Sequence, residues 1–354
     1  MGRWRRRGPG GPPLLGLDIG QHSIKLAHLD LTGVRPALVG LAAARTPLGL
    51  FDQHGALASR DALSDCVTQL AAELSLRQGD LACALDVPPA ELIPLSLSAE
   101  VDDPQAAVEA ALATRLPYPP GEAAIYWQEL PTEPEAALRR VMVSVAPRGL
   151  VEAVSSALAR TRFDPLVMDL APLAACHALI GCGEPWLRTA TVLLLDVGAT
   201  HITGTLVVAG EVTAVRAAAS GSEDVTLAVA DALAADLAVA ERYQREVLDL
   251  APDEAEGDEP DSTRAVRLAV EERLAGLPAL ADELLALAPE TNPPETILLY
   301  GGGARLRGLD DYLTARLGLT ARVAAPLATL EVSGELPPGL PGDAARYVTA
   351  LGLA

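Results

Sequence analysis

Two segments of the chain share one order of apolar and polar positions. An apolar run that ends in an aspartate and a glycine spans residues 14–20, and residues 193–198 repeat it. Short polar or small residues follow each glycine, and a second apolar run comes next, at 24–29 in the first copy and 202–208 in the second. Each copy therefore predicts a β-hairpin with a polar turn and an acidic residue near the end of its first strand.

The residue types in these two turns suit phosphate binding. Glycine lets backbone N–H groups approach an oxyanion closely, and hydroxyl groups add further donors. A triphosphate would repel Asp18 and Asp196 unless a cation lay between them, so we expect both to be ligands of a shared Mg²⁺, directly or through water. One such turn is compatible with an ordinary hairpin, whereas two copies favour a binding site. The expected phosphate contacts are Gly20, Gln21, His22 and Ser23 in the first copy and Gly198, Ala199 and Thr200 in the second.

The first hairpin also carries an unusual basic residue. Of the 27 lysines and arginines in the chain, only Lys25 is a lysine. A compact ammonium group just after the first turn can contact a β- or γ-phosphate as a point charge, a role that the wider guanidinium group fills less well. We therefore expect Lys25 to bind phosphate.

A third glycine-rich segment follows another apolar run. Residues 296–300 read as a strand, and Gly301, Gly302 and Gly303 come directly after it, ahead of a helical pattern over 309–317. A backbone without side chains lets a flat base or an α-phosphate lie against it. An ordinary tight turn would have the same sequence, but the position of this segment after both hairpins favours nucleotide binding.

Further elements are expected between these motifs. Helical periodicity and apolar runs predict a largely helical segment over 222–288 and single helices and strands elsewhere. The single helices are expected over 61–76, 104–115, 149–161 and 169–179, and the strands over 81–87, 92–97, 123–130 and 138–145. Residues 251–262 are rich in Asp and Glu and lack the glycine of a Ca²⁺ loop, so a solvated loop is favoured over a metal site.

Composition narrows the function. The chain has 354 residues, 50% of them hydrophobic, a formal net charge of −20 and a pI near 4.6. It is therefore long and apolar enough for two cores, and its acidity argues against a nucleic-acid partner, which would need a Lys/Arg stripe. An N-terminal cluster is the exception, and it reads as a disordered start or as a weak tether to anionic lipid. Its members are Arg3, Arg5, Arg6 and Arg7.

The sequence predicts a cytoplasmic protein with reduced cysteines. No apolar run reaches the roughly 18–20 residues of a membrane span, and Asp18 interrupts the apolar stretch that a signal peptide would need. The four cysteines show no metal or redox spacing and are expected to be reduced core residues. They are Cys66, Cys83, Cys176 and Cys182.

Taken together, the motifs resemble those of the actin-like ATPase superfamily. Residues 17–26 look like its first phosphate motif, 195–200 like its second and 300–304 like its adenosine motif. A more specific resemblance, to the family of type IV pilus assembly proteins PilM, which is related to the division protein FtsA, rests on 108–119 and on the C-terminal 350–354. The resemblance implies ATP and Mg²⁺ as cofactors.

The resemblance also implies a fold. It is an α/β, actin-like (ribonuclease H-like) fold in which duplicated domains 1A and 2A flank a nucleotide cleft and carry inserted subdomains 1C and 2B. The expected boundaries are a basic, disordered N-terminus over 1–13, domain 1A over 14–87, 1C over 88–163, the return of 1A with a connecting helix over 164–190, 2A over 191–221, 2B over 222–294, 2A again over 295–335 and a C-terminal crossing and helix over 336–354.

Three positions depart from the family pattern. Ala171 stands before Pro172 where relatives often have glutamate, and the loss of a carboxylate that could orient the attacking water predicts slow or absent hydrolysis. Glu241 and Gln244 match a nucleoside-contacting segment in which lysine is usual at the second position. Ser220 precedes Gly221 where relatives usually have two glycines. Two alternatives stay open, a small-molecule kinase of the superfamily and a nucleotide-free scaffold of a type II secretion system.

The resemblance implies a partner as well. PilM-like proteins bind the cytoplasmic N-terminal tail of the inner-membrane protein PilN between domains 1A and 1C, which here corresponds to residues 112–127. Tyr118, Tyr126 and Trp127 are expected to anchor that peptide, although they could equally pack the core of 1C. Through this partner the protein would be peripheral to the inner membrane and would serve pilus functions such as twitching motility or competence. Pilus motor ATPases are a further candidate partner.

Overall fold

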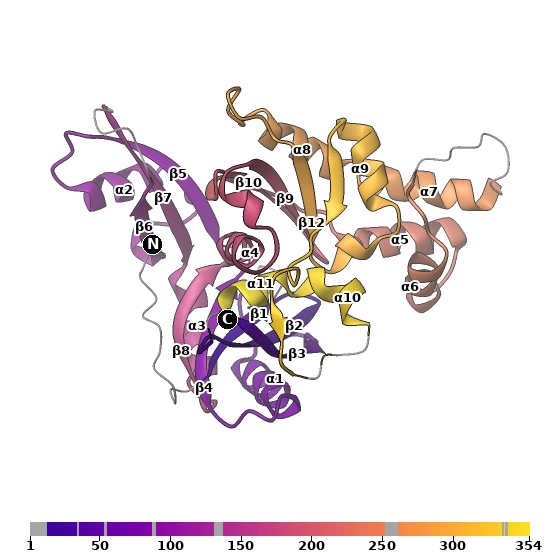
Figure 1. The fold of residues 1–354 in the computed structure, drawn as a ribbon, viewed down its shortest axis with the longest axis horizontal. Helices are drawn as coiled ribbons and strands as arrows, with labels where there is room; N and C mark the ends of the chain where they lie inside the picture. The colour runs from indigo at the N-terminus through magenta and orange to yellow at the C-terminus, as the bar shows by residue number, and fades with distance from the viewer. Residues whose placement is uncertain are drawn as a thin grey trace. The chain divides into compact units, whose positions relative to one another are not determined.

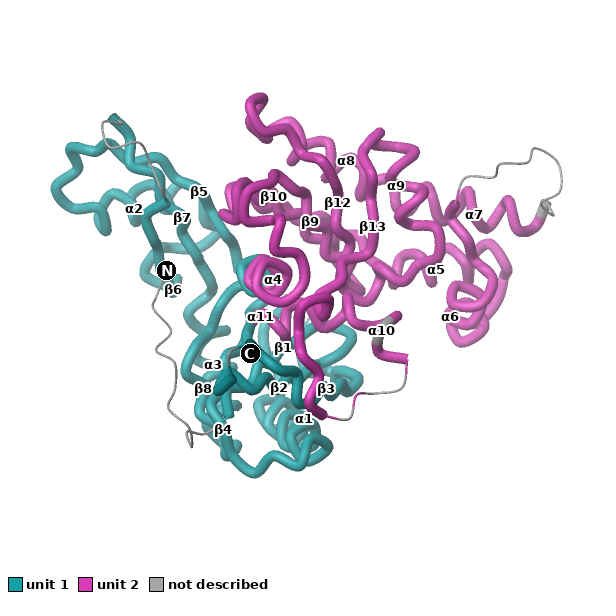
Figure 2. The backbone as a smooth tube through the Cα atoms, viewed as in Figure 1, with its two compact units in different colours: residues 1–174, 353–354 teal, residues 175–352 magenta. Residues whose placement is uncertain are grey.

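The computed structural model describes residues 13–33, 35–52, 55–86, 90–130, 137–251, 261–334, 336 and 339–354. The N-terminal arginine cluster and most of the acidic segment 251–262 lie outside these residues. The chain divides into two compact units, residues 1–174 with 353–354 and residues 175–352 (Figure 2). No helix in the described part of the chain is long and apolar enough to span a membrane.

The first unit is built on a mixed sheet in which five strands follow the order β3-β2-β1-β4-β8 (Figure 1). Strand β1 is antiparallel to β2 and parallel to β4, which is parallel to β8. The predicted first hairpin is confirmed as β1 and β2, whereas β3 was not expected from the sequence. The strands are β1 (Leu14–Ile19), β2 (Ser23–Asp30), β3 (Ala37–Arg45), β4 (Gly79–Leu85) and β8 (Phe163–Leu170).

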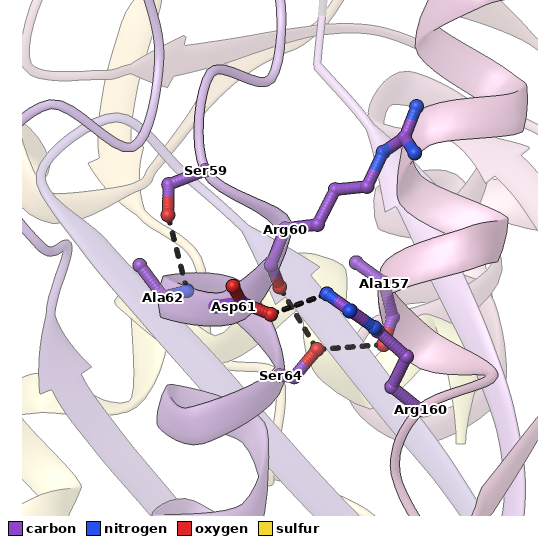
Figure 3. Close-up of polar contacts among 7 residues, drawn as sticks. All are labelled: Ser59, Arg60, Asp61, Ala62, Ser64, Ala157 and Arg160. Atoms are coloured by element: carbon purple, nitrogen blue, oxygen red, sulfur yellow. Dashed lines mark hydrogen bonds and ion pairs between the residues drawn. The ribbon is translucent and has the colours of Figure 1, made fainter.

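Two helices of this unit, α1 (Arg60–Glu73) and α3 (Arg148–Leu158), pack against each other (Figure 3). The Ser64 hydroxyl is buried in their contact, 2.8 Å from the carbonyl oxygens of both Arg60 and Ala157. Arg160 forms an exposed ion pair with Asp61 beside it. The buried hydroxyl therefore links the two helices where solvent does not compete, while the ion pair is screened by water.

A smaller antiparallel sheet, in the order β5-β7-β6, has its own core. Helix α2 covers one face through Val108 and Leu112, which pack against Leu95 and Val143. The strands predicted for the inserted module are present, and the last predicted helix, α3, contacts both this sheet and α1. The elements are β5 (Glu91–Ser98), α2 (Pro104–Leu112), the 3₁₀ turn η1 (Pro120–Glu122), β6 (Ala123–Glu129) and β7 (Leu138–Pro147).

The predicted helix over 169–179 is partly wrong, because Asp169 and Leu170 belong to strand β8, where they pair with Ala84 and Leu85 of β4. The helix α4 begins at Ala171, with Pro172 in its first turn, where proline favours a helix start. It spans Ala171–Ala178 and continues into a π-helical turn, η2 (Leu179–Gly183), and a 3₁₀ turn, η3 (Pro185–Arg188).

The second unit contains a five-stranded sheet in the order β11-β10-β9-β12-β13. This is the order of the first sheet repeated, with β9 and β10 in the places of β1 and β2. The second predicted hairpin is thus confirmed, as is the strand before the three glycines. The strands are β9 (Thr191–Val197), β10 (Ile202–Val208), β11 (Glu211–Ala218), β12 (Thr296–Tyr300) and β13 (Thr320–Val323).

The repetition extends to a local irregularity. In the first sheet the register between β2 and β3 shifts after His28, ten residues beyond Asp18, and in the second the register between β10 and β11 shifts after Leu206, ten residues beyond Asp196. A β-bulge strengthens local twist and bends a strand. The extra residue lies in the third strand of each sheet, Val39 in β3 and Thr213 in β11, so the two units share this irregularity at the same distance from the acidic turn.

In the described part of the second unit, five helices share the core of the sheet. Leu195, Ile202 and Ile297 from the strands pack with Val229, Leu284 and other apolar residues of these helices. They are α5 (Ser222–Leu233), α6 (Leu237–Glu246), α7 (Asp261–Arg273), α8 (Gly276–Leu285) and α9 (Leu309–Leu317). Helices α8 and α9 contact the strands of the sheet, and α6 and α7 pack on α5. The remaining elements are η4 (Gly302–Arg305), β14 (Glu331–Val332), α10 (Leu340–Asp343), η5 (Ala344–Tyr347) and α11 (Val348–Leu353).

All four cysteines are buried and free, as predicted. Burial raises the pKa of the Cys83 and Cys176 thiols to about 12, so neither is a thiolate near neutral pH. The cysteines therefore serve packing, not chemistry.

Candidate nucleotide-binding site

The first turn is shaped by a close backbone approach at Gly20. A Cβ on this residue would lie 2.9 Å from the Ser23 carbonyl oxygen, so only glycine fits. Thr46, just beyond β3, holds the turn from outside, because its hydroxyl donates to the Gly20 carbonyl at 2.7 Å and its N–H donates to the His22 carbonyl at 2.9 Å. Thr46 could not be predicted, since a single threonine after a strand that was not expected forms no motif.

Asp18 and Lys25 face each other across β1 and β2 at this turn. They are register partners, and Lys25 Nζ lies 2.7 Å from Asp18 Oδ2, with both side chains largely buried. Burial raises the pKa of Asp18 above its ordinary value, and nearby Asp86 adds to the rise, whereas Lys25 opposes it. Burial therefore disfavours the charged form of this carboxyl group, and the ion pair with Lys25 offsets part of that cost.

A second carboxylate lies in the same row of the first sheet. Asp18 pairs with Ala84 of β4, and Ala84 pairs with Asp169 of β8, so the side chains of all three point to one face. The Asp169 carboxylate accepts a hydrogen bond from the Leu170 N–H at 2.8 Å. Asp169 therefore lies at the end of strand β8, and not on the connecting helix as the sequence predicted.

The second turn repeats the geometry of the first. A Cβ on Gly198 would lie 2.6 Å from the His201 carbonyl oxygen, which accepts from the Gly198 N–H at 3.1 Å. Thr200 is exposed, and its hydroxyl lies 3.2 Å from Nδ1 of the buried His201 ring. The turn therefore presents a hydroxyl whose orientation is supported by a neighbouring imidazole.

The start of α5 is fitted against this turn. The N–H groups of Ser222 and Glu223 donate to the carbonyls of Gly198 and Ala199, both at 2.9 Å. Gly221 makes this approach feasible, since a Cβ there would lie 2.1 Å from the Ala199 carbonyl oxygen. Gly221 is therefore needed to pack the helix on the turn, whatever else it contacts.

The three glycines follow β12 and lie beside the second acidic residue. Gly301 has a positive φ of 86°, and a Cβ on it would lie 2.1 Å from Asp196 Oδ1. A Cβ on Gly303 would lie 2.5 Å from Val197 Cγ1, whereas one on Gly302 would meet nothing within 4 Å. The loop thus packs tightly at its first and third glycines and is open at its second.

Helix α6 supplies the two expected nucleoside contacts. Glu241 and Gln244 lie one turn apart on this helix. Gln244 Oε1 accepts a hydrogen bond of 2.5 Å from the hydroxyl of Thr226 on α5. The sequence did not indicate Thr226, because the contact joins two helices through a residue type that is common on helix surfaces.

These residues fit a nucleotide with Mg²⁺. The described residues contain no group of three or more His, Cys, Asp or Glu side chains that could hold a metal ion by themselves. Mg²⁺ usually keeps several water ligands and takes one or two carboxylates together with substrate phosphates. Asp18 in the first unit and Asp196 in the second each place one carboxylate beside a glycine turn, which is the kind of ligand that such a site uses.

The three aromatic residues expected to bind a partner differ in exposure. Tyr118 and Trp127 pack on the core of the small sheet, and the Trp127 indole N–H donates to Gln105 Oε1 at 2.8 Å. Burial raises the pKa of Tyr118, and Glu91 adds to the rise. Tyr126 is 70% exposed. Tyr118 and Trp127 are thus half-buried against the core, and Tyr126 is the most exposed of the three rings.

The two sheets have the same strand order, and in each the first two strands form a hairpin with an aspartate beside its turn. This duplicated arrangement defines an actin-like fold. Solved structures agree: MreB 5 of Spiroplasma citri bound to AMPPNP matches with a TM-score of 0.58 and 12% identity over 97% of this chain and 95% of that one. EutJ, an ethanolamine utilization protein of Carboxydothermus hydrogenoformans, matches with 0.56 and 15% over 97% and 89%.

The chain belongs to the family of the type IV pilus assembly protein PilM, whose family model matches residues 16–354. The solved PilM–PilN type IV pilus biogenesis complex matches with a TM-score of 0.80 and 27% identity over 96% of this chain and 97% of that one. A comparison with curated protein sequences finds no match. The molecule is therefore an actin-like protein of type IV pilus assembly.

Proposed function

We propose that this protein binds ATP with Mg²⁺ through both acidic turns and binds the cytoplasmic N-terminal peptide of a PilN-like inner-membrane protein. The observation that carries the nucleotide part is the repeated placement of Asp18 and Asp196 on equivalent strands, each followed by a glycine turn closed in the same way. Structures with the same fold that are bound to AMPPNP and ADP support it.

Each residue has a distinct role in this proposal. Lys25 leaves Asp18 to contact the β- or γ-phosphate, and Asp18 and Asp196 bind Mg²⁺ or its water ligands. Bound Mg²⁺ would neutralise phosphate charge. Backbone N–H groups of the two turns contact phosphate oxygens, and the open Gly302 gives the nucleoside access to the backbone of its loop. Ala171 offers no carboxylate to orient water, so the nucleotide acts chiefly as a structural ligand.

The partner part of the proposal rests on the similarity to the PilM–PilN complex. Tyr126 is the side chain best placed to contact a peptide on the small sheet, because it is 70% exposed and points away from Trp127 and the core. An exposed tyrosine adds contact area at low cost in conformational entropy. The protein would then work in the cytoplasm, held near the inner membrane by its partner.

Calorimetry tests both parts. Mg·ATP and a synthetic PilN-type N-terminal peptide are titrated separately and then together into the full chain. We expect each to bind, and we expect Tyr126→Ala to weaken the peptide at least tenfold while leaving Mg·ATP unchanged. Leu138→Ala is a matched control, since Leu138 is also exposed, at 53%, on the neighbouring strand β7. No binding of Mg·ATP would overturn the nucleotide part, and no binding of the peptide would overturn the partner part.

A further inference from the structure

The two acidic turns differ in the residue that stands opposite each aspartate. In the first sheet Asp18 pairs with Lys25 of β2, and in the second sheet Asp196 pairs with Thr203 of β10. Both partners are buried, with exposures of 8% for Lys25 and 3% for Thr203. The repeat therefore places an ammonium group beside one aspartate and a hydroxyl group beside the other.

The Asp18–Lys25 pair is enclosed by protein. The side chain of Lys25 is 11% exposed and that of Asp18 is 14% exposed, and 2.7 Å separate Nζ from Oδ2. Ile24 and Leu26, which flank Lys25 on β2, are fully buried. Within the residues that the structure describes, Asp18 is the only hydrogen-bond partner of Nζ. Neither charge can therefore exchange its partner for bulk water at little cost.

The ammonium group also lies beside the first glycine turn. A Cβ on Gly20 would lie 3.7 Å from Lys25 Nζ. A phosphate group held by the backbone of this turn would thus be within reach of Nζ, and it would compete with the Asp18 carboxylate for that ammonium. The carboxylate would at the same time repel the phosphate.

Opening a buried ion pair is costly when only one partner finds a new ligand, because the other charge is left uncompensated in the interior. A phosphate that takes Lys25 alone would strand Asp18, which would also face the like charge of nearby Asp86. A cation that takes Asp18 alone would strand Lys25. A phosphate and a cation that bind together leave neither charge alone, so the pair opens at low cost only when both are present.

We infer that the Asp18–Lys25 pair makes the binding of phosphate and of a divalent cation mutually dependent, so that the first hairpin accepts the metal complex of a polyphosphate and discriminates against the metal-free anion. The inference rests on the proposed binding of ATP. Coupling between two ligands is reciprocal, so the nucleotide tightens the cation by the same factor. The dependence belongs to the first hairpin, since Thr203 gives Asp196 no ammonium to release.

The test compares Mg·ATP with ATP in the presence of EDTA, by calorimetry on the full chain. We expect the wild type to bind Mg·ATP at least tenfold more tightly, which is about 1.4 kcal/mol. Asp18→Asn should weaken Mg·ATP and yet bind metal-free ATP at least about fivefold more tightly than the wild type does, because Lys25 is then free for phosphate. A damaged fold would weaken both ligands, and thermal unfolding checks for it.

Two controls isolate the contribution of Lys25. Asp196→Asn also removes a carboxylate from the proposed site but releases no ammonium, so its affinity for metal-free ATP should rise less than that of Asp18→Asn. Lys25→Met keeps the length of the side chain without its charge, and in this background Asp18→Asn should no longer tighten metal-free ATP.

Three results would overturn the inference. The first is metal-free ATP binding that does not improve in a folded Asp18→Asn variant. The second is an equal improvement in Asp196→Asn, and the third is an improvement that survives in the Lys25→Met background. Failure of the wild type to bind ATP in either form would instead overturn the proposed nucleotide function itself.

Discussion

The Asp196 carboxylate occupies the space that a side chain on Gly301 would need. A Cβ at position 301 would lie 2.1 Å from Asp196 Oδ1, and the backbone of Gly301 has a φ of 86°. Its N–H also donates to the Ala345 carbonyl at 3.1 Å. The acidic residue of the second hairpin and the glycine loop after β12 therefore hold each other in place.

Gly301→Ala should consequently destabilise the protein by about 1–3 kcal/mol, because alanine is strained at this φ and its methyl group displaces Asp196. Urea unfolding would measure the change. Gly302→Ala is the matched control, since its Cβ meets nothing within 4 Å. Equal stability of the two variants would contradict the tight packing at Gly301.

Lys25→Ala and Asp196→Ala should each weaken Mg·ATP binding at least tenfold, or about 1.4 kcal/mol. In the proposed site, the first variant would lose the ammonium group that contacts phosphate, and the second would lose a ligand of Mg²⁺ or of its water. Calorimetry gives the affinities, and circular dichroism checks folding. Asp65→Ala, at an exposed position of α1, should change nothing. Full affinity in both site variants would remove the basis for the proposed site.

Mg·ATP affinity should fall with decreasing pH because of Asp18. Burial raises the pKa of its carboxyl above the ordinary value of 3.8. As pH decreases through this raised pKa, Asp18 takes up a proton and stops attracting Mg²⁺, so the loss begins at a higher pH than for an exposed aspartate. Titrations between about pH 4.5 and 7.5 would show it, and Asp18→Asn should bind weakly with a flatter profile.

The same shift has a consequence for folding. Because the folded pKa lies above the unfolded one, the folded state holds the proton more tightly, and the contribution of Asp18 to stability decreases as pH rises through the window above 3.8. Asp18→Asn should remove this pH-dependent component. Urea unfolding of both proteins at several pH values checks the sign, and a slope that survives in the variant would argue for a different group.

ATP hydrolysis by the purified chain should be slower than about 1 s⁻¹, the lower end of ordinary turnover. Ala171, at the start of α4, has no carboxylate to orient water. Phosphate release measures the rate. Faster turnover would favour the small-molecule kinase alternative, with Asp169 as the nearest candidate base in the row of Asp18, and product analysis with sugar acceptors would then follow.

Ser64→Ala should cost about 0.5–1.5 kcal/mol of stability, because its buried hydroxyl joins α1 to α3. Arg160→Ala removes the neighbouring ion pair, whose side chains are 55% and 79% exposed, and should change stability by less than about 0.5 kcal/mol. Thermal unfolding ranks the two variants. A larger effect from Arg160 would reverse our assignment of which contact stabilises the helix pair.

The sequence predicted the elements whose pattern is local. Both acidic hairpins, the strand before the three glycines and the helix over 309–317 agree with the structure. Strand β3 was missed because Gly40 and the alanines at 42–44 have low β-propensity. Pairing with β2, which the sequence does not reveal, stabilises the strand. The boundary at Asp169 was misplaced because only its pairing with Ala84 extends the strand that far.

The site shows the same limit. Its aspartates and glycines form motifs that repeat along the chain and can be read directly. Thr46 and Thr226 contribute through contacts with segments distant in sequence, and an isolated threonine carries no pattern. The fit of α5 against the second turn likewise depends on backbone carbonyls, which have no sequence signature.

The single lysine makes the first hairpin chemically addressable. Lys25 is 8% exposed and lies within β2, between buried neighbours. A protease specific for lysine therefore has one cleavage point in the whole chain, the peptide bond between Lys25 and Leu26, and can reach it only when the hairpin opens. Amine-acylating reagents likewise find one side chain to label. Cleavage and labelling rates would each report the opening of this one strand, without an engineered probe.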